Sequence, residues 1–302
     1  MGTHRLKELA FRLRRGLCRR LLPFTPNPRP DSLPFVSGDT FRAMADHIYE
    51  NGREFRPEAV RAGAVIFVDV KMIDRYFAEA HPKIAAKYVL ITHNGDRNID
   101  AALAAKLDDR IAAWFAQNVA VRHDKIRPIP IGLENRYYCN NGLPRIFARL
   151  RRAATPKKNR ILYGFTVATN PTERQPALDA LSTCASADRL EGWPIPPEYA
   201  RVLHGYKFVA SPPGNGIDCI RTWEALLLRT VPIVKRNIMN EHFLGLGLPL
   251  VLIDDWRDLA AWDEKKLSEM YLALESGFDD PHTMFAPWRK MIEDAARAVG
   301  RR

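Results

Sequence analysis

Residues 207–236, with the sequence KFVASPPGNGIDCIRTWEALLLRTVPIVKR, contain the densest set of side chains that could do chemistry. An apolar run is followed by a segment rich in glycine and proline, then by a helical pattern and a second apolar run. This order predicts a strand, a loop, a helix and a second strand. In an open α/β sheet such a loop lies at a ligand site, where backbone N–H groups and the positive end of the next helix hold an anion. We expect a nucleotide diphosphate there.

One carboxylate in this stretch lies on the apolar face of the predicted helix. If the helix starts near Asp218, Glu224 projects through the middle of an apolar stripe. The stripe consists of Ile220, Trp223, Leu227 and Leu228. Burying an unpaired carboxylate costs several kcal/mol, so Glu224 needs hydrogen-bond donors. The two adjacent hydroxyls of a ribose are suitable donors, and an ion pair with Arg221, one turn back, is the structural alternative.

A second corner from strand to helix is predicted in residues 160–182, RILYGFTVATNPTERQPALDALS. Pro171 falls near the first helical turn, where its missing N–H costs nothing. Arg174 follows, and its planar guanidinium can grip two phosphate oxygens. The alternative is a solvated arginine that pairs with Glu173 or Asp179.

The first half of the chain contains a predicted βαβ unit. Strands are expected at 63–70 and at the start of residues 87–98, KYVLITHNGDRN, with the helical stretch 71–86 between them. His93, Asn94 and Asp96 therefore follow the carboxyl end of a strand. A helix over 99–117 and a segment over 125–135, which contains Glu134, come next.

Three runs of residues within 214–234 resemble the signature of exostosin-like glycosyltransferases and, less closely, the donor-binding segment of α1,3-fucosyltransferases. The runs are Gly214-Asn215-Gly216-Ile217-Asp218, Arg221-Thr222-Trp223-Glu224-Ala225-Leu226 and Val231-Pro232-Ile233-Val234. The Thr169-Asn170-Pro-x-x-Arg174 arrangement and the segments 87–98 and 125–135 resemble the same enzymes, so the resemblance covers roughly residues 60–240. The chain looks more like a bacterial enzyme of surface polysaccharide, such as lipopolysaccharide or capsule, than like an animal Golgi enzyme.

The resemblance implies transfer of a sugar from a nucleotide-sugar donor to a hydroxyl of a glycan or lipid-linked glycan, with inversion at the anomeric carbon. It implies that Glu224 holds the donor ribose and that Arg174 contacts the diphosphate. Arg221 and Lys235 are further cations for the departing diphosphate. The expected donor-binding set is Asn170, Arg174, Ser211, Gly214, Asn215, Gly216, Asp218, Arg221, Thr222, Glu224 and Lys235.

An inverting transfer needs a base for the acceptor hydroxyl. Asp96 can take the proton directly or orient His93, and Glu134 is the reserve. The alternative makes Asp96 the N-cap of the next helix and Asn94-Gly95 a simple turn.

Length and composition fit two α/β domains. A chain of 302 residues allows two domains of about 100 to 150 residues, and strands that alternate with helical stretches favour parallel sheets. We predict a GT-B-type fold, in which two Rossmann-like domains face each other across a cleft. Residues 1–33 are expected to form a basic helix and a proline-rich linker, 34–150 an acceptor-side domain, and 151–302 a nucleotide-sugar-binding domain.

The net charge of +11 is concentrated in two segments. Residues 1–33 carry eight Lys and Arg against two acids, a net of +6, and residues 144–160 carry seven and no acid. No nucleic-acid-binding signature is present, so nucleic acid is not expected as a physiological partner. The second segment is interpreted as a solvated linker helix, or as a basic segment whose positive charge favours phosphate binding in a neighbouring cleft.

The first basic segment has the pattern of an amphipathic helix that lies on an anionic membrane surface. Its apolar positions are Leu6, Leu9, Ala10, Leu13, Leu17 and Leu21. A helix docked on the protein itself or on a partner is the alternative. The prolines at 23, 26, 28 and 30 indicate a stiff linker after it.

The four cysteines have no metal-ligand spacing and are interpreted as free thiols in a reducing compartment. They are Cys18, Cys139, Cys184 and Cys219. No signal peptide and no segment of 18 apolar residues is present, so we expect a cytoplasmic protein at the inner face of the cell membrane. No paired acids have the spacing that holds Mg²⁺ or Mn²⁺ on a diphosphate, so neither metal nor cofactor is expected.

Two other functions remain compatible with the sequence. One is a sugar-nucleotide epimerase on the same scaffold, because a fold does not fix a reaction. The other is a non-catalytic, membrane-associated scaffold of a polysaccharide assembly complex.

Overall fold

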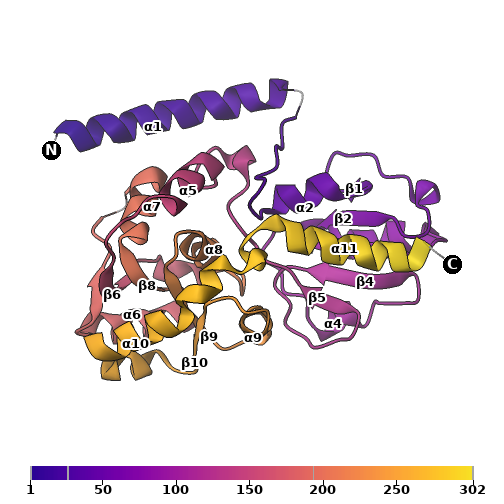
Figure 1. Ribbon diagram of the computed structural model, residues 1–302. Coiled ribbons are helices and arrows are strands. Elements are labelled where there is room, and N and C mark those ends of the chain that lie inside the picture. Colours follow the sequence, from indigo (N-terminus) through magenta and orange to yellow (C-terminus); the bar gives the residue numbers. More distant parts are fainter. Residues whose placement is uncertain (1, 26, 193, 301–302) are drawn as a thin grey trace.

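The computed structural model describes residues 2–25, 27–192 and 194–300. Two five-stranded sheets, each paired in parallel throughout, lie side by side with helices around them (Figure 1). The predicted α/β class with two Rossmann-like domains is confirmed.

The N-terminal sheet has the strand order β1-β2-β3-β4-β5. The strands are β1 (His47–Tyr49), β2 (Val65–Asp69), β3 (Tyr88–His93), β4 (Ile111–Ala116) and β5 (Ile126–Pro128). The central strands VIFVD, YVLITH and IAAWFA are almost fully buried, because both faces of a parallel sheet are covered. The loops that follow β2, β3, β4 and β5 therefore meet at one edge of the sheet.

The C-terminal sheet has the order β10-β9-β8-β6-β7. The strands are β6 (Lys158–Tyr163), β7 (Ala187–Arg189), β8 (Tyr206–Ala210), β9 (Val231–Lys235) and β10 (Val251–Ile253). The strand order reverses between β6 and β8, and ligands of doubly wound sheets bind in the crevice outside such a switch point. Gly164 follows β6 and residues 211–219 follow β8, so these two segments flank the crevice.

The helices are α1 (Gly2–Leu21), α2 (Gly38–Met44), α3 (Ile73–Arg75), α4 (Ala101–Ala104), α5 (Pro144–Arg151), α6 (Pro171–Thr183), α7 (Pro196–His204), α8 (Ile220–Leu227), α9 (Ile238–Gly245), α10 (Glu264–Leu274) and α11 (Phe285–Gly300). The helices α3 to α9 lie in connections between strands, whereas α1 and α2 precede β1 and α10 and α11 follow β10. The predicted order of strand, loop, helix and strand over 207–236 is confirmed by β8, α8 and β9. Pro171 is the first residue of α6, as expected.

Two helices cross the predicted domain boundaries. The last helix, α11, packs against β3, β4 and α2 of the N-terminal domain, although its residues fall in the predicted C-terminal domain (Figure 1). The basic helix α5 packs on α7 and α8 of the C-terminal domain, although all of it except Arg151 falls in the predicted N-terminal domain. Each domain is thus completed by a segment assigned to the other.

The predicted helix over 99–117 is wrong. Only Ala101–Ala104 is α-helical, and Ile111–Ala116 forms β4 in the middle of the sheet. The run IAAWFA is buried on both faces, and a short apolar run of this kind cannot be told from a helix by its periodicity. The predicted helical stretch 71–86 is helical without a break from Val70 to Lys83, where 3₁₀, α (α3), π and 3₁₀ turns follow one another.

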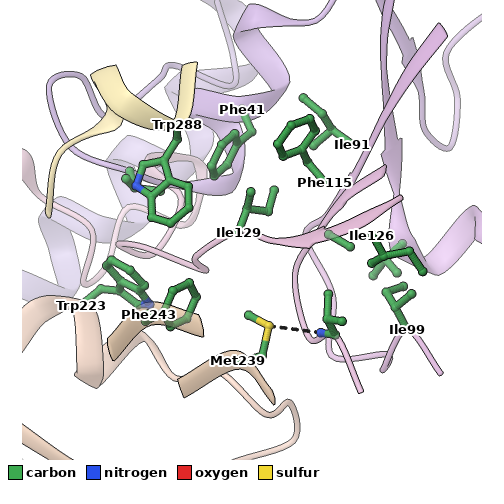
Figure 2. Packing of buried hydrophobic residues seen from close by; sticks show 14 of the residues in the cluster. Phe41, Ile91, Ile99, Phe115, Ile126, Ile129, Trp223, Met239, Phe243 and Trp288 are labelled. Atoms are coloured by element: carbon green, nitrogen blue, oxygen red, sulfur yellow. Dashed lines mark hydrogen bonds between the residues drawn. The ribbon is translucent and has the colours of Figure 1, made fainter. Parts of the chain in front are cut away.

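A continuous apolar seam joins the two domains (Figure 2). Trp223 of α8 and Phe243 of α9 pack edge to face against Trp288 of α11, with ring centroids 6.5 and 6.1 Å away. On the other side of the seam the backbone N–H of Val119 donates to Met239 Sδ. This packing holds the two domains in a fixed position relative to each other.

The helix α1 lies along the outside of the molecule (Figure 1) and is bonded to the loop after β5. Cys18 and Cys139 form a disulfide, so the prediction of four free thiols is wrong, although Cys184 and Cys219 are free. Spacing along the sequence could not reveal this pair, because 121 residues separate the two cysteines. Arg19 Nε also donates to the carbonyl oxygen of Tyr138 at 3.0 Å.

The leucine face of α1 does not dock on the protein. Its leucines are 54 to 68% exposed, and they are Leu6, Leu9, Leu13, Leu17 and Leu21. At 100° per residue the centre of this face lies about 120° around the helix from Cys18, through which the disulfide attaches the helix to the body. No helix in the described part of the chain is both long and apolar enough to cross a bilayer.

The second half of the predicted linker is held on the N-terminal domain. Arg29 forms ion pairs with Asp39 (2.5 Å) and Glu50 (2.7 Å), and Ser32 is fully buried. Pro26, one of the predicted linker prolines, lies outside the described residues.

Candidate functional site

A cavity of about 340 Å³ lies between the domains, outside the carboxyl ends of β6 and β8. The N-terminal domain contributes Asp96, Ile131 and Asn141, and the remaining lining comes from Gly164, Arg174, Leu190, Pro194, Pro196, Tyr199, Gly214, Asn215, Gly216, Asp218, Cys219, Ile220, Arg221 and Glu224. We call it the interdomain cavity. It supplies the predicted cleft across which the two domains face each other, as in the GT-B arrangement.

Glu224 is a buried carboxyl group that faces the interdomain cavity. It is only 6% exposed, and in the described part of the chain it makes no hydrogen bond and no ion pair. Burial raises the pKa of Glu224 to about 8, against the pull of the Arg221 charge. The alternative of a structural ion pair fails, because the Arg221 guanidinium donates instead to the carbonyl oxygen of Gly164 at 2.9 Å.

Arg174 and Arg221 bring two positive charges to the same cavity. Both guanidinium groups lie over the ring of Phe165, at 5.8 and 5.9 Å from its centroid. Neither has an acidic partner among the described residues. Burial, and then the nearby Arg221 charge, lower the pKa of Arg174. Two adjacent unpaired cations favour an anion between them and the N-terminus of α8.

Arg174 also shapes the glycine-rich loop. Its Nε donates to the carbonyl oxygen of Pro213 at 2.9 Å, and its Nη1 donates to that of Thr166 at 3.0 Å. A Cβ on Gly214 would lie 2.8 Å from Arg174 Nη2, so a side chain at this position would displace the guanidinium. The alternative of a solvated arginine is contradicted, since Arg174 is 8% exposed.

Three predicted donor-binding residues support the loop instead of lining the cavity. Asn170 caps α6 and donates through Nδ2 to the carbonyl oxygen of Gly214 at 2.9 Å. Ser211 Oγ and Thr222 Oγ1 are hydrogen-bonded at 2.9 Å and buried, which ties the end of β8 to α8. These three residues hold the loop in place but do not line the interdomain cavity.

Asp218 connects the loop to the N-terminal domain. Its carboxylate accepts hydrogen bonds from the backbone N–H of Ile131 at 2.7 Å and from Trp223 Nε1 at 2.9 Å. Burial raises the pKa of Asp218 to about 7, although these N–H groups favour its charged form. The carboxylate is thus committed to a contact between domains and is not free for a ligand.

Asn118 makes the second link between the domains. Its Oδ1 accepts from the backbone N–H of Asp218 at 3.0 Å, and its Nδ2 donates to the carbonyl oxygen of Gly95 at 3.2 Å. A Cβ on Gly216 would lie 2.6 Å from Asn118 Nδ2. The loop that carries Asp96 is therefore positioned directly against the glycine-rich loop.

A smaller cavity of about 180 Å³ adjoins the first, and Asp96, Ile131 and Ile220 line both. Its other lining residues are Gly38, Lys71, His93, Asn94, Gly95, Gln117, Leu133, Glu134, Asn135 and Tyr138. We call it the N-domain cavity. Most of it is built from loops at the carboxyl ends of β2, β3, β4 and β5.

His93 cannot act as the predicted base. It is 2% exposed, and its Nδ1 accepts the backbone N–H of Asn94 at 2.7 Å. Its Nε2 lies 3.0 Å from the carbonyl oxygen of Pro130, so that nitrogen carries the hydrogen. Burial lowers the pKa of His93 to about 4. Both ring nitrogens are in use, and the imidazole is a structural element of the loop.

The two carboxylates among the predicted bases remain available. Asp96 is exposed, makes no side-chain hydrogen bond in the described chain, and lies where the two cavities meet. It is not the N-cap of α4, because Asp100 fills that position. Glu134 is half-buried, burial raises its pKa, and it accepts the backbone N–H of Asn141 at 2.7 Å.

Lys235 is not at this site. Its ammonium donates to the carbonyl oxygen of Asp254, and it lines a separate surface cavity between α6 and Trp256. Residues that sequence reasoning missed include Gln117, Asn118 and Tyr199. Tyr199 Oη is buried beside the interdomain cavity with no hydrogen-bond partner among the described residues. No pattern in the sequence marked these positions, because each acts through contacts made by the fold.

Among the described residues, no three or more His, Cys, Asp or Glu side chains are grouped so that they could hold a metal ion. The predicted absence of metal and cofactor is not tested by this observation.

No family model matches the sequence, and no curated protein matches it. Similar solved structures include the spinosyn rhamnosyltransferase SpnG complexed with thymidine diphosphate, at 12% identity and a TM-score of 0.36 over 78% of this chain and 70% of that chain. OtsA in its apo form has 10% identity and a TM-score of 0.46 over 94% of this chain and 76% of that chain. The UDP-GlcNAc 2-epimerase of Methanocaldococcus jannaschii in complex with UDP-GlcNAc and UDP has 13% identity and a TM-score of 0.33 over 78% of this chain and 75% of that chain. Similarity at this level assigns no family and no activity.

Proposed function

We propose that the protein is a glycosyltransferase that moves a sugar from a nucleotide-sugar donor to a hydroxyl of a glycan. The observation that carries the proposal is Glu224, a buried carboxyl group that has no partner among the described residues and lies in the same cavity as Arg174 and Arg221, which have no acidic partner there. A nucleotide sugar supplies hydrogen-bond donors for Glu224 and an anion for the two arginines. Its ribose hydroxyls donate to Glu224, and its diphosphate lies between Arg174 and Arg221.

The arginines also account for the leaving group. When the bond between the anomeric carbon and the diphosphate oxygen breaks, the negative charge that develops is stabilised by Arg174, Arg221 and the N-terminus of α8. Guanidinium groups can serve here without a divalent cation, so we propose a metal-independent reaction.

The acceptor reacts from the N-terminal side of the cleft. Its hydroxyl oxygen bonds to the anomeric carbon on the face opposite the departing diphosphate, which inverts that centre. Its proton passes to Asp96, which lies where the cavities meet and has no side-chain hydrogen-bond partner in the part of the chain that the structure describes. Glu134 is the second candidate base. The resemblance to exostosin-like enzymes extends the proposal to bacterial surface polysaccharide.

A panel of nucleotides tests the donor site. Full-length protein is melted with UDP, GDP, CMP and dTDP, because a ligand at 100 times its Kd adds about 2.7 kcal/mol of stability. We expect one base to stabilise the wild-type protein and to have less effect on Glu224→Gln. The matched control is Glu269→Gln, the same change on an exposed face of α10.

The corresponding nucleotide sugars then separate the functions. A glycosyltransferase releases nucleoside diphosphate slowly without an acceptor, an epimerase interconverts the sugars, and a scaffold does neither. Interconversion without release, or no nucleotide binding at all, rejects the proposal.

We further propose that α1 attaches the enzyme to an anionic bilayer. The exposed leucine face and the net charge of +6 in residues 1–33 fit a surface that offers both acyl chains and negative headgroups. The helix lies along the outside of the molecule (Figure 1) and its leucines are exposed, so a membrane can reach them without any rearrangement.

A further inference from the structure

The N-domain cavity contains a buried amide with no partner. Gln117 directly follows β4 and is 3% exposed, yet its side chain makes no hydrogen bond within the described residues. Its Oε1 is a buried oxygen to which no described residue donates a hydrogen bond. Leaving such a group unsatisfied costs about 1 to 3 kcal/mol, and a native structure keeps it for a reason.

Two further polar groups face the same cavity without partners. Lys71 follows β2 and Asp96 follows β3, and neither side chain makes a hydrogen bond or ion pair in the described chain. Lys71 and Asp96, which are exposed, and the buried Gln117 thus line one cavity from the ends of three neighbouring strands. Together they can donate to and accept from several hydroxyls on one small molecule.

The volume of the N-domain cavity and the exposed ring of Tyr138 limit the kind of ligand that fits. The cavity volume of about 180 Å³ corresponds to about six waters at about 30 Å³ each. Tyr138, which is 41% exposed, lines the cavity and presents an aromatic ring. A single polyhydroxylated ring meets these limits, since it has hydroxyls around its rim and apolar C–H faces that pack on an aromatic side chain.

We infer that the N-domain cavity is a subsite for one sugar ring of the acceptor, recognised through its hydroxyls by Gln117. The inference rests on the proposed function, since it gives that reaction its acceptor class. Rotation about the last side-chain torsion of Gln117 lets either end of the amide face the ring, because such torsions are broad. Asp96 then lies at the boundary between the bound ring and the interdomain cavity.

The test uses full-length protein and the methyl glycosides of glucose, galactose, mannose and N-acetylglucosamine, titrated by saturation-transfer NMR. We expect at least one glycoside to bind wild-type protein, and Gln117→Met to bind it at least fivefold more weakly. Gln175→Met is the matched control, because Gln175 lies on the exposed face of α6 and pairs with Asp179. It should bind the glycoside as wild type does.

Melting temperature is measured for each variant to show that it is folded. Methionine fills the same space and removes an unsatisfied polar group, so Gln117→Met should melt no lower than wild type. If it does not fold, Gln117→Asn, which withdraws the amide by one methylene, replaces it with the same expectation. No binding of any glycoside to wild type, or equal affinity in the Gln117 variant, overturns the inference.

Nucleotide melting shifts on the same proteins keep the two proposals apart, because Gln117 does not line the interdomain cavity. A nucleotide shift without glycoside binding rejects the subsite alone. Glycoside binding that depends on Gln117, without any nucleotide shift, supports the sugar subsite and rejects the proposed donor.

Discussion

At the scale of single residues, function depends on which polar groups the fold leaves without a partner. Among the described residues Glu224 is buried and unpaired in the interdomain cavity. Lys235 and His93 are not left free, because the tertiary structure brings the carbonyl oxygens of Asp254 and Pro130 to them.

The raised pKa of Glu224 predicts a pH-dependent cost in stability. In the folded state the group stays protonated up to about pH 8, whereas in the unfolded chain it ionises near its ordinary value. The part of the free energy of unfolding that depends on protonated Glu224 is therefore present at low pH and is lost as the pH rises toward 8. Glu224→Gln cannot ionise, so it should melt above wild type at pH 8, by at least about 2 °C, and by less at pH 5.

Melting curves of both proteins without nucleotide, from pH 5 to pH 9, check this expectation. If the difference in melting temperature between Glu224→Gln and wild type does not grow with pH, the expectation is wrong. Greater stability together with weaker nucleotide binding would mark Glu224 as a group kept for function rather than for the fold.

Asp96 carries the prediction for the chemical step. Asp96→Asn should lower kcat of sugar transfer by about 10² to 10⁴ with little change in donor affinity, because a base acts mainly in the transition state. Asp109→Asn, at a position 99% exposed, is the control and should retain wild-type turnover. Wild-type turnover in Asp96→Asn would transfer the role to Glu134.

At the scale of elements, the sequence predicted the strand-to-helix corners of the C-terminal domain better than the N-terminal helices. Gly214 and Pro171 are local signals of a loop and a helix start, and both lie as expected. The helix over 99–117 was wrong because IAAWFA is apolar at every position, so burial on both faces determines its conformation. The links from Asn118 and Asp218 across the domains could not be predicted, because they join residues about 100 apart.

The helix α1 gives the prediction at this scale. Leu13→Gln with Leu17→Gln should abolish sedimentation with phosphatidylglycerol vesicles, since it removes apolar contact without changing charge. Leu244→Gln with Leu272→Gln changes two exposed leucines elsewhere and should leave sedimentation intact. Salt should weaken binding of the wild type, because the Debye length is about 10 Å at 0.1 M. Equal sedimentation of both double variants would show that the leucine face does not contact lipid.

At the scale of the whole molecule, the site is a product of two domains. The glycine-rich loop of one domain and the Asp96 loop of the other meet through Asn118 and Asp218, above the apolar seam around Trp288. The disulfide from Cys18 to Cys139 attaches α1 to the loop whose Tyr138 lines the N-domain cavity. The proposed membrane attachment and the proposed acceptor subsite thus share one segment of chain.

The central claim is that Glu224 holds the ribose of a nucleotide donor, and a double-mutant cycle tests it most directly. Calorimetry compares the nucleoside diphosphate selected by the melting panel with its analogue that lacks the ribose hydroxyls, on wild type and on Glu224→Gln. We predict that removing the hydroxyls costs the wild type about 1 to 3 kcal/mol of binding free energy and costs the variant much less, which gives a coupling energy of at least about 1 kcal/mol. An equal loss in both proteins would contradict the account.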